Sequence, residues 1–167
     1  MGGLPGNGGQ SAPPRLGSRK RHSPHGWGDM TDRLVPTVLL TGVAEMDGQH
    51  DQLFFEMQQV KNALLARSDV DEDGLLLLSR LAEDLDRHFA WENEAARAHG
   101  IPFEGHAREH ARIAGFVRGK IAEIRNGQCN VPALMVFMER SFESHVANFD
   151  LVLGRALRAA APHCNAV

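Results

Sequence analysis

Long segments in which apolar residues recur every three or four positions constrain the fold more than any other feature of this sequence. Four such segments cover about 47–67, 71–99, 104–126 and 130 to beyond 153. The alternation of β-branched residues that marks strands is not sustained anywhere beyond residue 45. Because helices of about 20 residues joined by short loops lie antiparallel to their neighbours, we expect an all-α, up-down-up-down four-helix bundle.

Residues with known preferences for helix ends mark the limits of these segments. Asp47 and Asp71 are suitable N-caps for the first and second helices. Gly100 ends the second helix, and Pro132 fits the first turn of the fourth, where its missing N–H has no helical partner. These positions support the same division into helices as the apolar period.

The first 34 residues differ in composition, since they are rich in glycine, proline and arginine and carry no apolar period. We expect residues 1–34 to be a disordered basic tail, because such a segment cannot bury enough apolar surface to offset its ordering entropy. An alternative is that translation starts at Met30. Residues 35–160 then form the bundle domain, with 35–46 as an extended arm packed on it.

Charge and composition exclude several classes of partner. The net charge of −3 disfavours a nucleic-acid groove or an anionic membrane surface. No apolar run reaches the roughly 18 residues of a membrane span, and the tail lacks the apolar stretch of a secretory signal. The two cysteines form no CxxC pair, so we expect a cytoplasmic protein. The sequence does not indicate which protein partner the chain has.

Residue types that bind metal ions recur at helical spacing inside these segments. His88 and Glu92 are four residues apart, as are His106 and His110, so each pair lies on one face of its helix. The first and last helices contribute three more candidates, which are His50, His145 and Asp150. Each residue alone has an ordinary explanation as a hydrogen-bonded core residue or a surface pair. The remaining histidines match no such pattern; they are His22, His25, His99 and His163.

Taken together, five histidines and two carboxylates in one bundle interior require a compensating cation. Burial of one unpaired carboxylate costs several kcal/mol, whereas a whole domain is stable by only about 5–15 kcal/mol. The imidazole-rich set suits iron, copper or zinc better than magnesium or calcium. Because seven protein donors exceed the needs of one tetrahedral zinc, we expect two metal ions that share the carboxylates as bridges.

The spacing of five residues between His145 and Asp150 does not fit a regular helix. On an ideal α-helix their side chains point about 140° apart, too far to face one centre. A π-type turn adds one residue per turn and is common at functional sites, so we predict one between these two residues. His145 shares the expected inner stripe of this helix with Phe142, Phe149 and Val152.

These motifs resemble those of the hemerythrins, specifically the bacterial hemerythrin-like domains. The resemblance runs from about Gly42 to Leu153 and rests on residues 42–50, 88–92 and 106–110 together with the His145–Asp150 segment. All seven ligand positions of the family have a match here, in order and in spacing.

The resemblance implies a non-haem di-iron centre, with a bridging oxo or hydroxo group and an open position for dioxygen on one iron. One iron would be bound by His106, His110 and His145. The other iron would be bound by His50 and His88. Two carboxylates would bridge the pair, Glu92 and Asp150. No catalytic residue and no organic cofactor are expected.

The chain departs from the family's usual residues around the expected dioxygen pocket. Asn93 replaces a second acidic residue, Ala96 replaces a common methionine, and Ser141 stands where a tryptophan is usual. We expect Trp91 to fill part of the space beside Ser141, and Trp27 is the candidate for an aromatic residue of the arm. These positions surround the ligand rather than the metal, so they bear on the lifetime of bound dioxygen.

The main functional hypothesis is an oxygen-binding protein for carriage, storage or sensing, and not an enzyme. Ferritin-like di-iron enzymes use carboxylate-rich sets, and five neutral imidazoles favour high-valent iron less. A wall that slows proton entry is expected from five residues, Phe54, Phe89, Trp91, Ile113 and Phe142. The alternatives are a di-iron enzyme that consumes peroxide or nitric oxide, and an iron-homeostasis protein. A metalloprotease is excluded, because residues 106–110 lack the glutamate of HExxH.

Overall fold

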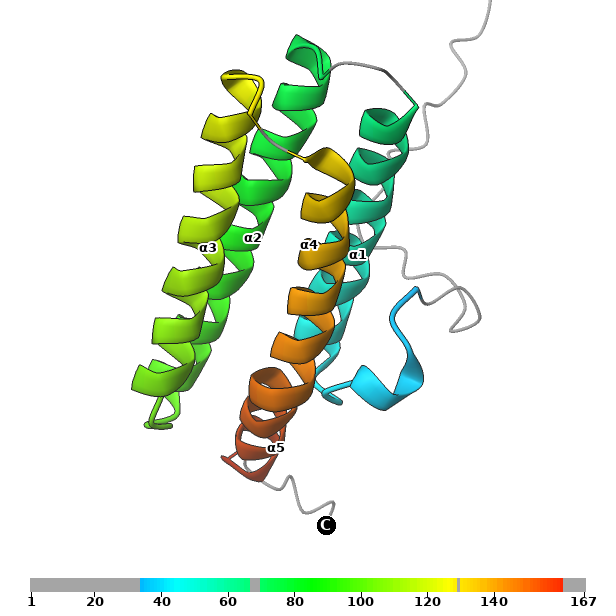
Figure 1. The fold of residues 1–167 in the computed structure, drawn as a ribbon. Coiled ribbons are helices and arrows are strands. Elements are labelled where there is room, and N and C mark those ends of the chain that lie inside the picture. The colour runs from blue at the N-terminus through cyan, green and yellow to red at the C-terminus, as the bar shows by residue number, and fades with distance from the viewer. Residues whose placement is uncertain (1–33, 67–69, 129, 161–167) are drawn as a thin grey trace, which may run out of the picture. The chain divides into compact units, whose positions relative to one another are not determined.

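The computed structural model describes residues 34–66, 70–128 and 130–160. Its helices are η1 (Thr37–Leu39), α1 (Ala44–Leu65), α2 (Glu72–Ala98), α3 (Glu104–Arg125), α4 (Val131–His145), η2 (Val146–Asp150) and α5 (Leu151–Ala160). The last three follow one another without a break and together form the predicted fourth helix (Figure 1). The predicted tail, apart from Leu34, lies outside the described residues, as do Met30 and Trp27.

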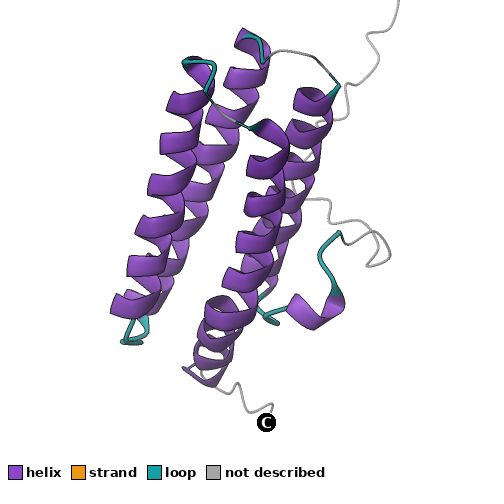
Figure 2. Ribbon diagram, viewed as in Figure 1, coloured by secondary structure: helices purple, strands orange, loops and turns teal. Residues whose placement is uncertain are grey.

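The long helices lie side by side, and each runs antiparallel to the next in the chain (Figure 1). Helix α1 packs on α2 and α4, and α3 packs on the same two helices. Figure 2 shows helices and loops but no strand within the described part of the chain. The all-α, up-down-up-down four-helix bundle is therefore confirmed. None of the described helices is both long and apolar enough to cross a membrane.

Two of the predicted helix starts have side-chain caps, the expected Asp71 and also Asn130. The Asp71 carboxylate accepts a hydrogen bond from the Gly74 backbone N–H at 2.9 Å, and the Asn130 side chain accepts one from Ala133 at 3.0 Å. Helix α2 ends just before Gly100, whose φ of +63° is a conformation that glycine adopts without strain. These local signals set the ends of α2 and the start of α4.

The predicted N-cap role of Asp47 is wrong, because α1 begins three residues earlier, at Ala44. Asp47 lies in the first turn, is only 5% exposed, and turns its carboxylate back toward the arm. It accepts hydrogen bonds from the Thr41 N–H and hydroxyl, both at 2.7 Å, and from the Gly42 N–H at 3.1 Å. The carboxylate therefore fixes the arm to the start of α1.

The arm is extended only in part, because residues 37–39 form the 3-10 turn η1. Val35 is buried against the main core, which confirms that the arm packs on the bundle. Thr41 packs so closely on α5 that a Cβ at Gly154 would stand 2.7 Å from the Thr41 Cβ. Glycine at 154 therefore lets the arm close this end of the bundle.

Residues 146–150 form the π turn that the sequence spacing predicts. The extra residue brings the Asp150 carboxylate to 3.1 Å from His145 Nε2. It also shifts the register of the following helix, so that Leu153 and Leu157 are buried. Val152, predicted to lie on the inner stripe, is 52% exposed, because the helical period restarts after the turn.

Two apolar clusters fill the bundle, and the metal-binding residue types lie between them. On α1, His50 lies between Met46 of the smaller cluster and Leu53 of the larger one. On α2, Glu92 comes one turn before Ala96 of the smaller cluster. Apolar side chains thus flank the polar layer on both sides along the bundle.

We predict that replacing Asp47 by alanine lowers the free energy of unfolding by about 2–3 kcal/mol, because two buried donors of Thr41 and the partly buried N–H of Gly42 lose their acceptor. The control is Asp86→Ala, which removes a solvent-exposed ion pair with Arg118 and changes stability by less than about 1 kcal/mol. Urea unfolding followed by circular dichroism measures both. Equal effects of the two substitutions would contradict this role for Asp47.

Candidate metal centre

The structure brings all seven predicted site residues together in the polar layer. Each of them is at most 8% exposed. Their ligand atoms form two groups, each with its atoms within 4.8 Å of one another. The first group consists of Glu92, His106, His110, His145 and Asp150. The second group consists of His50, His88, Glu92 and Asp150.

Glu92 belongs to both groups because its two oxygens face opposite ways. Oε1 lies 3.5 Å from His88 Nε2, in the second group. Oε2 lies 3.3 Å from His106 Nε2 and 3.1 Å from His110 Nε2, in the first group. One carboxylate from α2 therefore spans the two halves of the centre.

Asp150 spans the centre in the same way from the other side of the bundle. Its Oδ2 lies 3.2 Å from His50 Nε2, and its Oδ1 lies 2.9 Å from His106 Nε2 and 3.1 Å from His145 Nε2. The π turn is what aims this carboxylate inward from the last helix. A ligand that bridges two neighbouring cations must offer one oxygen to each of them. Both carboxylates have this arrangement, with one oxygen in each half of the centre.

The protein's own hydrogen bonds do not satisfy these groups. Both oxygens of Glu92 and both of Asp150 are buried without a hydrogen-bond partner. The Nε2 atoms of His106 and His110 each lie 3.0 Å from Nε2 of His145, although a neutral imidazole has only one N–H to donate. Buried polar atoms are nearly always satisfied, so the donor set fits bound metal ions.

Burial controls the protonation of the carboxylates. It raises the pKa of Glu92 to about 10, and the adjacent Asp150 carboxylate adds to the shift. Burial acts in the same direction on Asp150, but His106, His145 and His50 outweigh it and lower the pKa of this carboxyl. Without a cation, Glu92 is therefore neutral at pH 7 and Asp150 carries the negative charge.

Burial also favours the neutral form of two imidazoles, those of His88 and His110. It lowers the pKa of His88 to about 3, with a further contribution from His50, and the pKa of His110 to about 2, with a contribution from His106. The neutral imidazole is the form that binds a metal ion. The electrostatics of the layer thus prepare His88 and His110 as ligands but leave Glu92 carrying a proton.

Gln49, which the sequence analysis did not single out, orients His88 from the neighbouring helix. The Gln49 amide nitrogen donates to Glu45 at 2.9 Å, so its Oε1 is left to accept from the Nδ1–H of His88, also at 2.9 Å. The proton of neutral His88 is thereby placed on Nδ1, and the lone pair of Nε2 faces Glu92. Gln49 follows no spacing pattern that reveals this contact in the sequence.

Aromatic rings fix the histidines of the first group. Phe89 stacks on His110 with ring centroids 3.7 Å apart and planes inclined by 12°. Phe149 lies 5.3 Å from His145 at 18°. Phe103, in the loop before α3, lies 4.4 Å from the His106 ring and was not predicted. These contacts limit the rotation of the rings about their side-chain bonds.

The expected wall around the centre is confirmed in part. Phe89, Ile113 and Phe142 line an apolar cavity beside it, and Phe54 packs against Phe142 with ring centroids 6.4 Å apart. Trp91 does not fill this space; it lines a surface groove between α1 and α2. It comes directly before the buried Glu92, about 100° around the helix, so its half-buried side chain packs on the smaller apolar cluster instead.

The comparisons with known proteins agree with this geometry. A family model described as the hemerythrin HHE cation binding domain matches residues 41–157. The match includes all seven residues of the two groups. No curated protein and no solved structure matches the chain significantly.

The raised pKa of Glu92 makes a prediction for the metal-free protein. In the unfolded chain Glu92 ionises at its ordinary pKa of 4.5, and in the folded protein it ionises near 10. The free energy of unfolding therefore falls as the pH rises between these two values. The free energy of unfolding of Glu92→Gln relative to that of the parent should therefore increase by about 3 kcal/mol between pH 6 and pH 8. Urea unfolding in a chelator tests this, and a difference that does not change with pH would contradict it.

The contact between Gln49 and His88 makes a second prediction. Gln49→Leu should weaken metal binding by about 10–100-fold, because His88 loses the acceptor that fixes its proton. The matched control is Gln52→Leu, since Gln52 is one turn further along α1 and donates to Glu56 instead. Metal affinity measured by competition with a chelator compares the variants. Equal affinities would show that Gln49 does not orient the ligand.

Proposed function

Since the chain belongs to the hemerythrin family of cation-binding domains, we propose that it binds two iron ions in the polar layer and carries dioxygen reversibly. The proposed ligands are the seven residues of the two groups. Five imidazoles and two carboxylates suit iron, and the two oxygens of each carboxylate face different halves of the centre. Two iron ions would supply a redox-active pair with room for an external ligand.

The unequal number of donors in the two groups carries this proposal. The first group offers three histidines and the second only two, while both share Glu92 and Asp150. An ion bound by the second group therefore has fewer protein ligands and a position left for a small molecule. His88 of this group lines the apolar cavity, so that position is served from a hydrophobic space.

The surroundings of the second group favour binding over chemical turnover. His50 and His88 are 1% and 4% exposed, and Phe142 packs edge-on against His50 at 5.6 Å. Turnover of dioxygen or peroxide needs protons delivered to the reacting oxygen. On the cavity side of these ligands, apolar side chains slow that delivery and so favour a ligand that leaves unchanged, whereas on its other side His88 lines a surface groove with Gln49 and Arg87.

One observation favours the second candidate, a di-iron enzyme that consumes peroxide or nitric oxide. Ser141 comes one turn before His145 and lines the same cavity as His88, so its hydroxyl brings a polar group into the apolar wall. If the Ser141 hydroxyl admits water to the cavity, replacing Ser141 by alanine should lengthen the lifetime of the oxygenated form. An unchanged lifetime would remove Ser141 from the argument.

Reversibility distinguishes carriage from the other functions. The protein is loaded with ferrous iron without oxygen, exposed to air and returned to anaerobic conditions, while visible absorption and bound iron are measured. Carriage predicts about two iron ions per chain and a spectrum that appears and disappears over repeated cycles. One-way conversion to the ferric form would contradict carriage and support the enzyme or iron-homeostasis functions.

Matched histidine variants test where the iron binds. His110→Ala removes a ligand from the first group and should reduce bound iron and abolish the oxygen-dependent spectrum. His99→Ala is the control, because His99 is exposed and contacts the Ala95 carbonyl outside the centre. Full iron content in His110→Ala would contradict the proposed ligand set.

A further inference from the structure

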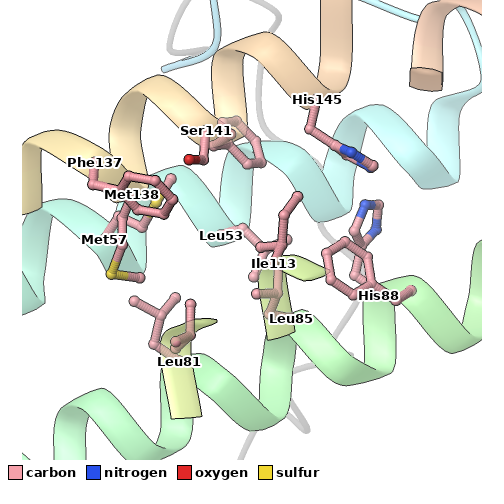
Figure 3. A pocket seen from close by; sticks show the side chains of 13 residues that line it. Leu53, Met57, Leu81, Leu85, His88, Ile113, Phe137, Met138, Ser141 and His145 are labelled. Atoms are coloured by element: carbon pink, nitrogen blue, oxygen red, sulfur yellow. The ribbon is translucent and has the colours of Figure 1, made fainter. Parts of the chain in front are cut away.

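A hydrated metal ion cannot reach the proposed centre through the apolar cavity beside it. Figure 3 shows His88 and His145 at one end of this cavity, and the remaining lining is apolar except for Ser141. The volume is about 30 Å³, which is room for about one or two water molecules but not for a cation with its hydration shell. Because transfer of an ion into apolar surroundings is strongly unfavourable, the ion needs a polar way in.

The surface groove beside His106 has the wrong charge for a cation. Glu104 and Gly105 line it at the start of α3, where the N-cap Phe103 makes no side-chain hydrogen bond to the first N–H groups. A guanidinium nitrogen of Arg108 lies 3.9 Å from the point where a Cβ of Gly105 would stand. The positive end of the helix dipole and Arg108 both repel a cation and so oppose the Glu104 carboxylate.

The surface groove beside His88, the α1–α2 groove, lies between two helices that run side by side (Figure 1). Its polar lining includes Gln49 and Gln52 from α1 and Asp84 and Arg87 from α2. All of these residues lie well inside their helices, so the helix dipoles do not oppose a cation here. The groove therefore gives a polar approach to one of the proposed metal ligands.

Negative charge predominates around the α1–α2 groove. The two glutamines of the lining donate hydrogen bonds to the carboxylates of Glu45 and Glu56, at 2.9 and 2.6 Å. One oxygen of Glu56, Oε2, is buried without a hydrogen-bond partner. The lining itself adds the carboxylate of Asp84, which pairs with the guanidinium of Arg87. Three carboxylates against one guanidinium raise the local concentration of cations.

The ion pair in the groove is arranged so that it can open. The Arg87 side chain is 70% exposed and that of Asp84 only 20%, so Arg87 can turn into solvent while the Asp84 carboxylate stays in the groove. An exposed ion pair contributes little stability, and a divalent cation attracts a carboxylate more strongly than a guanidinium does. Asp84 is therefore available to a cation that enters the groove.

His88 is held from the groove side and carries no stacked ring in the described part of the chain. Its Nδ1–H donates to Gln49, which itself lines the groove. The rings of His50 and Phe89 lie 4.9 and 5.8 Å away and are inclined by 70° and 45°, whereas Phe89 stacks on His110 at 12°. The His88 ring can therefore turn toward the groove when the Gln49 oxygen binds a cation instead.

We propose that the α1–α2 groove is the entrance of the metal centre and binds a hydrated divalent cation on its way in. Asp84 supplies the first ligand, and the Gln49 amide oxygen and the His88 imidazole then pass the ion to the second group of ligands. This entrance rests on the proposed function in that the centre must hold metal ions, but it does not require carriage of dioxygen.

Cobalt(II) is the probe for this entrance, because it is divalent, absorbs visible light when bound by imidazoles and carboxylates, and requires no dioxygen. The metal-free full chain is mixed with cobalt chloride, and the rate of uptake is measured by stopped-flow absorption. Asp84→Asn should slow uptake by about threefold or more, and Arg87→Gln, which leaves the carboxylate unpaired, should speed it by a similar factor. Both differences should shrink at high salt.

The affinity for cobalt at equilibrium separates an entrance from a permanent ligand. Neither substitution removes one of the seven proposed ligands, so both variants should bind cobalt with an affinity within about twofold of the parent's. A loss of affinity in Asp84→Asn as large as its loss of uptake rate would overturn the proposal, because Asp84 would then belong to the final site.

The ion pair of Asp86 and Arg118 provides the matched control, because it is exposed, lies outside the groove and joins the same side-chain types at 2.6 Å. Asp86→Asn should leave the uptake rate unchanged, as should Glu104→Gln in the groove beside His106. Circular dichroism shows whether the variants fold. Equal rates in Asp84→Asn and Asp86→Asn, or slower uptake in Glu104→Gln, would overturn the entrance but not the centre. Failure of the parent to bind cobalt would overturn both.

Discussion

Two carboxylates buried face to face determine how this bundle is built. Glu92 and Asp150 are both 0% exposed and have no hydrogen-bond partner for any of their four oxygens. Burial raises the pKa of Glu92 to about 10, so without a cation this residue is held as the neutral acid. The proposed pair of cations between the carboxylates would remove that cost, satisfy the surrounding imidazoles and link all the helices of the bundle. The geometry of the histidines follows from this single requirement.

The parts of the fold outside the centre bury its residues and orient their side chains. Apolar clusters close both sides of the polar layer, and Asp47 fixes the arm across the end of the bundle through Thr41. Gln49 sets the proton of His88, and stacked phenylalanines fix the histidines of the first group. Because these contacts hold the ligand side chains in place before any metal binds, ordering them reduces the favourable free energy of metal binding only slightly.

Periodicity and spacing in the sequence were enough to predict the bundle, the seven clustered residues and the π turn. The turn could be predicted because His145 and Asp150 can face one centre only if a residue is inserted between them. Its effect on the next helix was missed, and Val152 is therefore outside rather than inside. The role of Asp47 was predicted wrongly and the role of Gln49 was not predicted, both for a different reason. Their roles depend on partners in the arm and on another helix, and no local pattern encodes such contacts.

The central claim is that two metal ions lie between the carboxylates. Anomalous X-ray diffraction from crystals of the iron-loaded protein, recorded at the iron absorption edge, tests it most directly. The account predicts two peaks, one within each group of ligands, with an oxygen of Glu92 and an oxygen of Asp150 in contact with each. A single peak, or peaks confined to surface histidines such as His99, would contradict it.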